Sequence, residues 1–463
     1  MQLKDDKRQK NQLQQSLAFP ETGRSEALEG SGRGTESLVV KHMSESPASS
    51  EQLMEEICQV ENCSQALARV KSNKGSPGID GMTVEKLPDY LKQHWPKVKE
   101  QLLSGTYKPQ PVKRVEIPKP DGGTRKLGIP TALDRLIQQM VLQVLQRSWD
   151  PTFSAHSYGF RPGRSAHQAV AQAQQYIAEG YGWVVDLDLE KFFDRVNHDR
   201  LMARMAQGIS DKRVLKLIRR FLQAGVMENG LVSPVDEGTP QGGPLSPLLS
   251  NIVLDELDRE LERRGHRHVR YADDCNIYVR SQRAGERVME GVTRYLTTKL
   301  KLKVNQAKSA VARPKDRKFL GFSFTSGRNA RRRIAPKAIL RFKERIRELT
   351  CRTRAVSMEQ RVQQLSAYLR GWRGYFGFCQ TPSVLDTLDQ WLRRRLRSAI
   401  WKQWKLGSTK FAKLRAHGIG RDLAAQTAAS PHGPWRLANS PALQYAFPNS
   451  YFDSLGLPRL RSH

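Results

Sequence analysis

The chain has 463 residues, with 77 Lys and Arg against 46 Asp and Glu, so its formal net charge is +31. Hydrophobic residues make up 38% of the chain and charged residues 27%, which is the composition of a globular protein and excludes a wholly disordered one. The basic excess indicates a polyanionic partner. The sequence has no apolar run of about 18 residues and no N-terminal hydrophobic segment, so we expect neither a membrane span nor secretion. The five cysteines include no C-x-x-C pair, which favours a reducing compartment without structural zinc.

The N-terminal third is expected to be a polar tail followed by helices and one hairpin. Residues 1–50 are rich in Gln, Ser, Glu and Gly without an apolar period, which predicts a flexible tail. From residue 51, apolar residues recur at steps of three and four, which predicts a helix that leads into a glycine-rich turn at 73–81. Residues 112–130 alternate between apolar and polar types around a Pro-Asp-Gly-Gly turn, which predicts a β-hairpin, and a helical pattern follows.

The middle of the chain mixes strands and helices. Residues 183–193 are predicted as a strand that runs into the start of a helix, residues 201–226 as a helix and residues 268–280 as two paired strands. The sequence contains no internal repeat, so solenoid architectures are excluded. The pattern is that of an α+β domain.

The last third is helical and carries most of the positive charge. Apolar residues at helical spacing predict three helices between residues 339 and 396. Residues 311–421 hold 28 Lys and Arg against 6 Asp and Glu, a net charge of +22. In the third helix, Arg393, Arg394 and Arg397 alternate with Leu and Trp residues, a mixture that suits contact with phosphates and bases. A solvated basic face is the alternative.

Two acidic segments give the strongest indication of chemistry. Asp273 and Asp274 lie side by side between two predicted strands, where adjacent carboxylates repel each other unless a cation such as Mg²⁺ binds them. Alone, such a pair is more often a solvated turn. A second acidic source is the strand over 183–193, where a spacing of two puts Asp186 and Asp188 on one face. Together the two segments predict a two-metal site for phosphoryl transfer, as in a polymerase palm.

The spacing to the next aromatic ring favours Asp188 over Asp186 as the metal ligand. In polymerase palms, the residue five positions after the metal-binding Asp lies under the sugar of the incoming nucleotide. This position is Phe193 for Asp188 and Lys191 for Asp186. The ring of Phe193 would fill the space of a 2′-hydroxyl, so we expect selection for deoxynucleotides. A role of Phe193 in the core alone is the alternative.

Several short motifs follow one another in a characteristic order. They are GIDG at 78–81, IPKPDGG at 117–123, LGIP at 127–130, SYGFRPGRS at 157–165, GTPQGGPLSP at 238–247, YADD at 271–274 and FLGF at 319–322. This order closely resembles that of the reverse transcriptase and maturase proteins encoded by prokaryotic group II introns. The resemblance runs from about residue 51 into the C-terminal region.

The resemblance implies an α+β fold in the form of a right-hand polymerase. Fingers and palm would consist of an antiparallel sheet plus helices, followed by an α-helical thumb. The implied parts are the flexible tail (1–50), the N-terminal extension and fingers (51–180), the palm (181–330), the thumb or maturase domain (331–405) and a small DNA-binding tail (406–463). Relatives with an H-N-H endonuclease domain carry paired cysteines after the thumb, and this sequence has none there, so we expect no cleavage of the second DNA strand.

Roles of single residues also follow from the resemblance. The catalytic metal ligands would be Asp188, Asp273 and Asp274, holding two Mg²⁺ ions for which Mn²⁺ is a substitute. The nucleotide-binding residues would be Lys119, Arg125, Phe193 and Gln241, of which Lys119 and Arg125 hold the triphosphate. The nucleic-acid-binding residues would be Trp372, Arg373, Arg393, Arg394 and Arg397. For the stretch around Trp372, packing in a helical core is the alternative.

The implied activity is that of an RNA-directed DNA polymerase that copies intron RNA at a cleaved DNA target and assists the folding and splicing of that RNA. The implied partners are intron RNA, an RNA template with a DNA primer or cleaved DNA target, and deoxynucleoside triphosphates, with no membrane. The implied location is the prokaryotic cytoplasm, as a ribonucleoprotein. Two alternatives are an RNA-binding maturase with little polymerase activity and a related reverse transcriptase adapted to host defence or repair.

Overall fold

The computed structural model describes residues 52–118, 123–228, 231–233, 237–238, 242–327, 329–351 and 356–461. The chain forms two compact units, one that ends at Ala335 and one that begins at Pro336. This division lies next to the predicted end of the palm at residue 330. The predicted polar tail lies outside the described residues. Within the described ranges, none of the helices combines the length and the apolar character needed to cross a bilayer.

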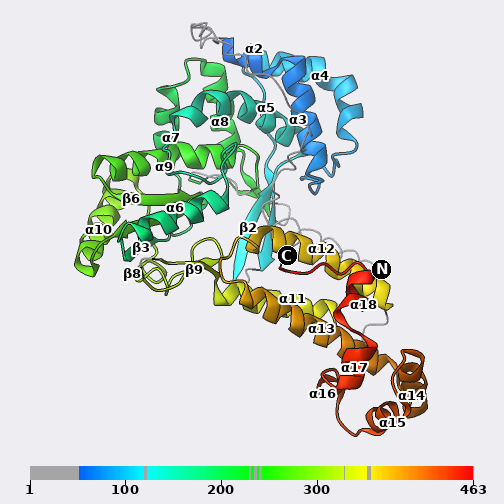
Figure 1. Ribbon diagram of the computed structural model, residues 1–463. Coiled ribbons are helices and arrows are strands. Elements are labelled where there is room, and N and C mark those ends of the chain that lie inside the picture. Colours follow the sequence, from blue (N-terminus) through cyan, green and yellow to red (C-terminus); the bar gives the residue numbers. More distant parts are fainter. Residues whose placement is uncertain are drawn as a thin grey trace, which may run out of the picture. The chain divides into compact units, whose positions relative to one another are not determined.

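The first unit begins with a layer of helices around α5 (Ala132–Trp149), which is buried along most of its length (Figure 1). Thr131 caps this helix, because its Oγ1 accepts a hydrogen bond of 3.1 Å from the backbone N–H of Asp134. The other helices of the layer are α2 (Leu53–Ile57), α3 (Val60–Ser72), α4 (Leu87–Leu103) and α8 (Lys212–Gln223).

The predicted hairpin is present as β1 (Val112–Pro118) and β2 (Thr124–Ile129). The strands pair antiparallel, from Lys113 opposite Ile129 to Pro118 opposite Thr124. β4 (Val226–Glu228) and β5 (Leu231–Ser233) extend them into a sheet of order β2-β1-β4-β5. The hairpin turn at 119–122 lies outside the described residues.

The second part of the first unit is a four-stranded antiparallel sheet of order β6-β7-β3-β8, which confirms the predicted sheet of the palm. Its strands are β3 (Trp183–Leu187), β6 (Arg267–Tyr271), β7 (Asp274–Val279) and β8 (Ala310–Ala312). The remaining elements of the unit are η2 (Asp150–Thr152), α6 (Ala166–Ala178), η3 (Phe192–Asp194), α7 (His198–Ala206), α9 (Ser246–Arg263), α10 (Gln282–Tyr295), η4 (Leu296–Leu300), β9 (Phe322–Phe324) and β10 (Arg332–Ile334).

Helices α6 and α10 cover opposite faces of this sheet. Gly285 of α10 lies against Val185 and Val311, since a Cβ added there would come within 2.5 Å of Val311 and 3.5 Å of Val185. On the other face, the ring of Tyr176 from α6 lies 5.7 Å from that of Tyr278. Side chains alternate along a strand, so the residues at even positions of β3 share the face of α6.

One predicted helix in the first unit needs correction. The helix predicted over 201–226 is divided into α7 and α8, because Gly208 packs on the ring of Trp149 and Asp211 caps α8. One hydrophobic core runs through residues on both sides of position 180, where the boundary between fingers and palm stays a prediction.

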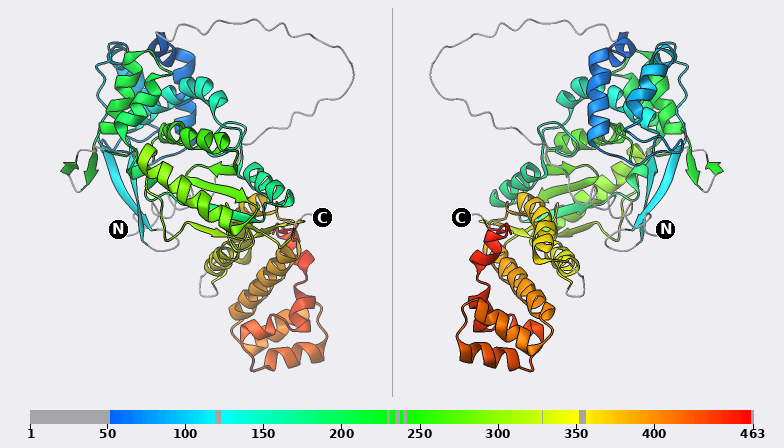
Figure 2. Two further views of the ribbon diagram at one scale, coloured as in Figure 1. Left: turned by 90° about the vertical axis from the view of Figure 1, so that its left-hand side faces the viewer. Right: turned by 90° about the vertical axis from the view of Figure 1, so that its right-hand side faces the viewer.

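The second unit is entirely helical in its described residues (Figure 2). Its centre is an aromatic cluster in which the ring of Trp372 lies 4.4 Å from Phe342 and 4.8 Å from Phe376. The helices are α11 (Pro336–Leu349), α12 (Met358–Phe376), α13 (Ser383–Gln403), α14 (Gly407–Ala416), α15 (Arg421–Ala429), α16 (Pro434–Leu437), α17 (Pro441–Ala446) and α18 (Asn449–Ser454).

Burial contradicts direct nucleic-acid contact by Trp372, Arg393 and Arg397, so the prediction is wrong for these three residues. Trp372 and Arg393 are each 2% exposed and Arg397 is 9% exposed. The guanidinium of Arg393 donates to Asp389 at 3.0 Å and to Asp453 at 2.9 Å. Arg397 donates its Nε–H to the carbonyl of Phe447. These side chains therefore stabilise the helical unit.

Arg394 and Arg373 keep part of their surface exposed, so their predicted role stays open. Arg394 lies over the ring of Trp435 at 4.2 Å and donates to its carbonyl. The C-terminal residues beyond 405 are held to α13 by Asp453 and by Leu460, whose N–H donates to Asp389 at 2.9 Å. The predicted DNA-binding tail is therefore packed on the thumb.

Candidate active site

Asp273 and Asp274 lie at the tight turn between β6 and β7. Tyr271 stands opposite Asp274 in the strand register, so Ala272 and Asp273 alone form the turn. Ala272 has a φ of +57°, which is in the left-handed region. For a residue with a Cβ this conformation costs roughly 1–2 kcal/mol, so neighbouring groups must hold the turn.

Arg270 is the residue whose side chain connects the turn to helix α9 and so fixes its position. Its side chain is fully buried and donates to both carboxylate oxygens of Asp258 on α9 at 2.6–3.0 Å. Its Nη1 donates to Asn251 Oδ1 and to the carbonyl of Ala272, both at 2.9 Å, and its Nη2 donates to Ser157 Oγ at 2.7 Å. The backbone of the turn is thus bound directly to a helix of the core.

Gly159 packs against the back of the same turn. A Cβ on this residue would lie 2.2 Å from the backbone N of Ala272. Its carbonyl accepts a hydrogen bond of 2.9 Å from Asn251, and the N–H of Tyr158 donates to the carbonyl of Arg270. The close approach of the turn therefore requires the glycine of the motif at 157–165.

Asp188 follows the last residue of β3 and lies beside the turn. The register pairs Asp186 with Asn276 and ends at Leu187 with Cys275, so Asp188 and Asp274 are the next residues beyond the last pair. Both carboxylates are on the sheet face that α6 also covers. The N–H of Asp188 donates to Ser309 Oγ at 3.0 Å and its carbonyl accepts from Asn305 at 2.8 Å. Strand β3 and the segment after η4 therefore fix its position.

The cations near the site distinguish Asp186 from Asp188. Arg317 approaches Asp186 to 2.6 Å, which neutralises that carboxylate. The cation that pairs with Asp188 is Lys308, at 3.7 Å and 67% exposed. Asp188 is thus the carboxylate that is more available to a cation, and its assignment as the metal ligand stays a prediction. Sequence reasoning missed Arg317 and Lys308, which no motif marks.

The carboxylates raise one another's pKa. Burial is the main cause for Asp274, and the charges of Asp273, Asp186 and Asp188 add to it, so that the pKa of Asp274 is raised to about 7. The pKa of Asp273 is also raised, by burial and by Asp188, against an opposing effect of Arg125. The side chain of Asp274 still reaches solvent, so a cation can approach it.

The donor set fits a divalent cation of the Mg²⁺ type. Carboxylate oxygens are its preferred ligands, and a cation would relieve the repulsion among Asp188, Asp273 and Asp274. Within the described ranges, no three His, Cys, Asp or Glu side chains already surround one point closely enough to ligate an ion. Small rotations of exposed carboxylates would therefore accompany binding.

The structure describes two of the four predicted nucleotide-binding residues. Arg125 lies on β2 opposite Ile117 of β1, and its charge lowers the pKa of Asp273. Phe193 is half-buried in η3, with its ring 5.3 Å from that of Phe192. Lys119 and Gln241 lie outside the described residues.

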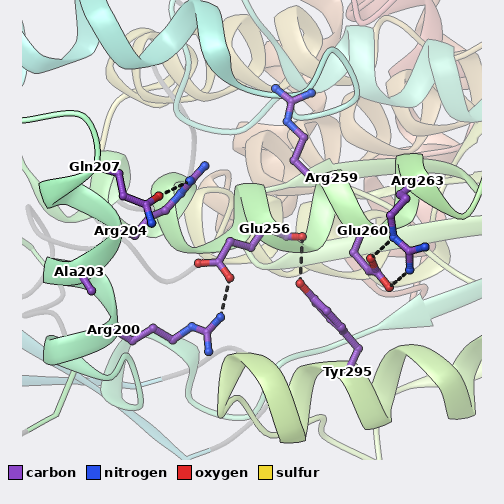
Figure 3. A pocket seen from close by; sticks show the side chains of 9 residues that line it. All are labelled: Arg200, Ala203, Arg204, Gln207, Glu256, Arg259, Glu260, Arg263 and Tyr295. Atoms are coloured by element: carbon purple, nitrogen blue, oxygen red, sulfur yellow. Dashed lines mark hydrogen bonds and ion pairs between the residues drawn. The ribbon is translucent and has the colours of Figure 1, made fainter.

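A hollow of about 590 Å³ lies elsewhere in the first unit, between α7, α9 and α10 (Figure 3). Its arginines are engaged by neighbouring acceptors, for example Arg200 by Glu256 at 2.5 Å and Arg263 by Glu260 at 2.7 Å. None of the three predicted catalytic carboxylates lines it. It is therefore distinct from the carboxylate site.

Comparison with known proteins gives the same assignment for both units. The family described as reverse transcriptase (RNA-dependent DNA polymerase) matches residues 117–324, and the maturase-specific domain of group II introns matches residues 339–418. Protein YkfC of Escherichia coli is 34% identical over 323 residues, which cover 61% of this chain and 84% of YkfC. The chain belongs to the family of group II intron reverse transcriptases and maturases. By family it is an RNA-directed DNA polymerase, an enzyme class that depends on a divalent metal.

Other members of the family match over shorter regions. The group II intron-encoded protein LtrA of Lactococcus lactis is 39% identical over 195 residues, which cover 42% of this chain and 32% of LtrA. Among solved structures, the partial Cas6-RT-Cas1–Cas2 complex is 27% identical with a TM-score of 0.35, covering 53% of this chain and 42% of that chain.

We predict that the metal-free protein loses stability as the pH rises from about 4 to about 7. In this window Asp274 is protonated in the folded state, where its pKa is about 7, and ionised in the unfolded state. Asp274→Asn should flatten this fall and raise the melting temperature at pH 8. Thermal unfolding in EDTA at a series of pH values measures both effects.

The control for this prediction is Asp199→Asn, which removes an exposed carboxylate on α7. It should leave the pH profile unchanged. Added Mg²⁺ should raise the melting temperature of the unmodified protein at pH 8 but not that of Asp274→Asn. Identical pH profiles for the unmodified protein and Asp274→Asn would contradict the assignment.

Proposed function

We propose that the chain synthesises DNA on an RNA template with Mg²⁺ at Asp188, Asp273 and Asp274. The template would be intron RNA and the primer a cleaved DNA target, and the same protein would assist folding and splicing of that RNA as a cytoplasmic ribonucleoprotein. The observation that carries the proposal is the convergence of Asp188, Asp273 and Asp274, since the charges of Asp188 and Asp273, together with burial, raise the pKa of Asp274 to about 7.

The reaction joins the 3′-oxygen of the primer to the α-phosphorus of a deoxynucleoside triphosphate and releases pyrophosphate. Mg²⁺ held by the three carboxylates, or Mn²⁺ in its place, would activate the 3′-oxygen and stabilise charge on the transferred phosphate. Arg125 would bind the triphosphate through paired hydrogen bonds from its guanidinium, and Lys119 would bind it through the compact charge of its ammonium group. Gln241 would lie in the loop under the template.

Phe193 would select the sugar. Its backbone follows Lys191, whose φ of +49° turns the chain sharply after β3. The ring is only partly buried, so it is available to contact a substrate as well as its neighbour Phe192. A ring at this position would exclude a 2′-hydroxyl by its volume.

In the second unit, we assign the nucleic-acid contact to cations around Trp391 on α13 in place of the buried Arg393. Lys343 and Arg347 of α11 each lie 5.9 Å from the centre of this ring, and Arg395 lies 5.4 Å from it. Leu340, one turn before Lys343, is 55% exposed. Cations beside an aromatic platform suit phosphates and bases.

A protein that only binds and folds RNA is the second candidate, favoured by the maturase-specific match over 339–418. Retention of the complete carboxylate set favours polymerase activity in the same chain. A relative adapted to host defence or repair would share this active site, but the maturase-specific match favours an intron role.

We predict that Asp273→Asn abolishes primer extension on an RNA template while binding of the template and primer is retained. Removal of a metal ligand raises the reaction barrier by several kcal/mol, and each 1.4 kcal/mol is about ten-fold in rate. Single-turnover extension and equilibrium binding are measured in parallel, with Asp199→Asn as an exposed control. Extension at the unmodified rate in Asp273→Asn would refute the site, and splicing assistance retained in that variant would show that the two functions are separable.

We predict that Phe193→Val admits ribonucleotides. The smaller side chain leaves room for a 2′-hydroxyl, so kcat/KM should rise for a ribonucleotide and fall much less for the matching deoxynucleotide. Incorporation of a single nucleotide measures both values. Phe192→Val is the control, because Phe192 is 2% exposed and belongs to the core. If the ratio of the two kcat/KM values does not change, Phe193 is a packing residue only.

A further inference from the structure

Arg135, in the first turn of α5, is a buried cation for whose guanidinium the described residues supply no hydrogen-bond partner. It is 9% exposed, and its Nε and Nη2 are shielded from solvent and have no acceptor among those residues. The charge of Asp80 acts on it, but the two side chains form no ion pair in the described part of the chain. Burial of an unpaired guanidinium is costly, so the site suits an added anion.

A glycine-rich loop at 75–78 lies directly over this guanidinium. A Cβ added to Gly75 would lie 2.0 Å from Arg135 Nη1, and one on Gly78 would lie 2.7 Å from the Cα of Thr131. The loop can therefore approach the start of α5 only because these residues are glycines. It belongs to the segment that contains the GIDG motif, to which the proposed mechanism gives no role.

A second glycine-rich loop meets α5 one turn further on. Gln138, 7% exposed, lies so close to Gly243 that a Cβ there would come within 2.4 Å of Gln138 Oε1. A Cβ on Gly242 would lie 2.6 Å from the carbonyl of Gly128. Arg135 and Gln138 are three residues apart on one helix, so they lie on the same side. Arg135 is thus placed beside the loop that the resemblance assigns to template and nucleotide.

We propose that Arg135 receives a phosphate group of the bound substrate. The inference rests on the proposed polymerase function, because the template backbone and the nucleotide triphosphate are the two phosphate sources that this function brings into the fingers. A guanidinium presents a planar fork of donors that matches phosphate oxygens. The Nη1 atom is at the edge that faces Gly75, so the loop at 75–78 would have to move aside for a phosphate to bind there.

The test compares Arg135→Met, which keeps the length of the side chain and removes its charge, with Arg147→Met. Arg147 is on the same helix, 64% exposed and paired with Glu56 at the surface, so its loss controls for one positive charge. Binding of an RNA template annealed to a DNA primer is measured across KCl concentrations without Mg²⁺ and without nucleotide. The KM for the deoxynucleotide is measured separately.

If the phosphate belongs to the nucleic-acid backbone, Arg135→Met should weaken binding about ten-fold or more and reduce the log-log salt slope by about one. If it belongs to the nucleotide, the KM should rise by a similar factor while duplex binding is unchanged. Arg147→Met should change neither. Should Arg135→Met fail to fold, Arg135→Lys, which keeps the charge and loses the fork, gives the same comparison with a smaller effect.

Unchanged duplex affinity, salt slope and KM in a folded Arg135 variant would overturn the proposal and make Arg135 a packing residue. Failure of the polymerase proposal is distinguishable from this outcome. It would appear as normal extension by Asp273→Asn, whereas the effect of Arg135 on duplex binding is read without Mg²⁺ and without extension.

Discussion

The buried ion pair between Arg270 and Asp258 is the interaction on which the active-site geometry depends. It joins β6 to α9, and through the carbonyl of Ala272 it fixes the turn that carries Asp273 and Asp274. Burial of two charges is costly unless geometry and additional hydrogen bonds compensate. Asn251 and Ser157 supply these additional bonds. The strained backbone of Ala272 is therefore held by a network that removal of either charged partner would break.

The first unit has two places where buried charges are incompletely compensated by the protein itself. At each of them a bound metal ion or substrate would supply the opposite charge. Burial, together with the charges of the neighbouring carboxylates, raises the pKa of Asp274 to about 7, which suits a site completed by a cation. In the fingers, Arg135 is buried with no hydrogen-bond partner for its Nε and Nη2 among the residues that the structure describes, which suits a site completed by an anion. Both features reduce the stability of the unliganded protein, a common consequence of building a binding site.

The parts of the site that could be predicted from the sequence are those that strand periodicity and short motifs determine. Alternation along β3 placed Asp186 and Asp188 on one face, and the spacing to Phe193 favoured Asp188, which Arg317 does not neutralise. Helical spacing was less informative about which side chains are exposed. It shows which residues share a face of a helix, but it does not show which face another segment of the chain covers. Arg393 was therefore assigned to nucleic acid, although Asp453, 60 residues away, pairs with it in the core. Partners that come together only in the fold, such as Asp258 for Arg270, carry no local signal.

The most direct test of this account is the affinity for Mn²⁺ of the double variant Arg270→Met and Asp258→Leu, measured by the paramagnetic signal of the free ion. Removal of both charges avoids leaving one buried and unpaired, and circular dichroism checks that the variant is folded. We predict Mn²⁺ binding at least about ten-fold weaker, since 1.4 kcal/mol of lost ligand positioning has this effect. Arg263→Met with Glu260→Leu, an ion pair on the same helix in the hollow that none of the three carboxylates lines, should bind Mn²⁺ normally. A folded Arg270 and Asp258 double variant with unchanged Mn²⁺ affinity would contradict the account.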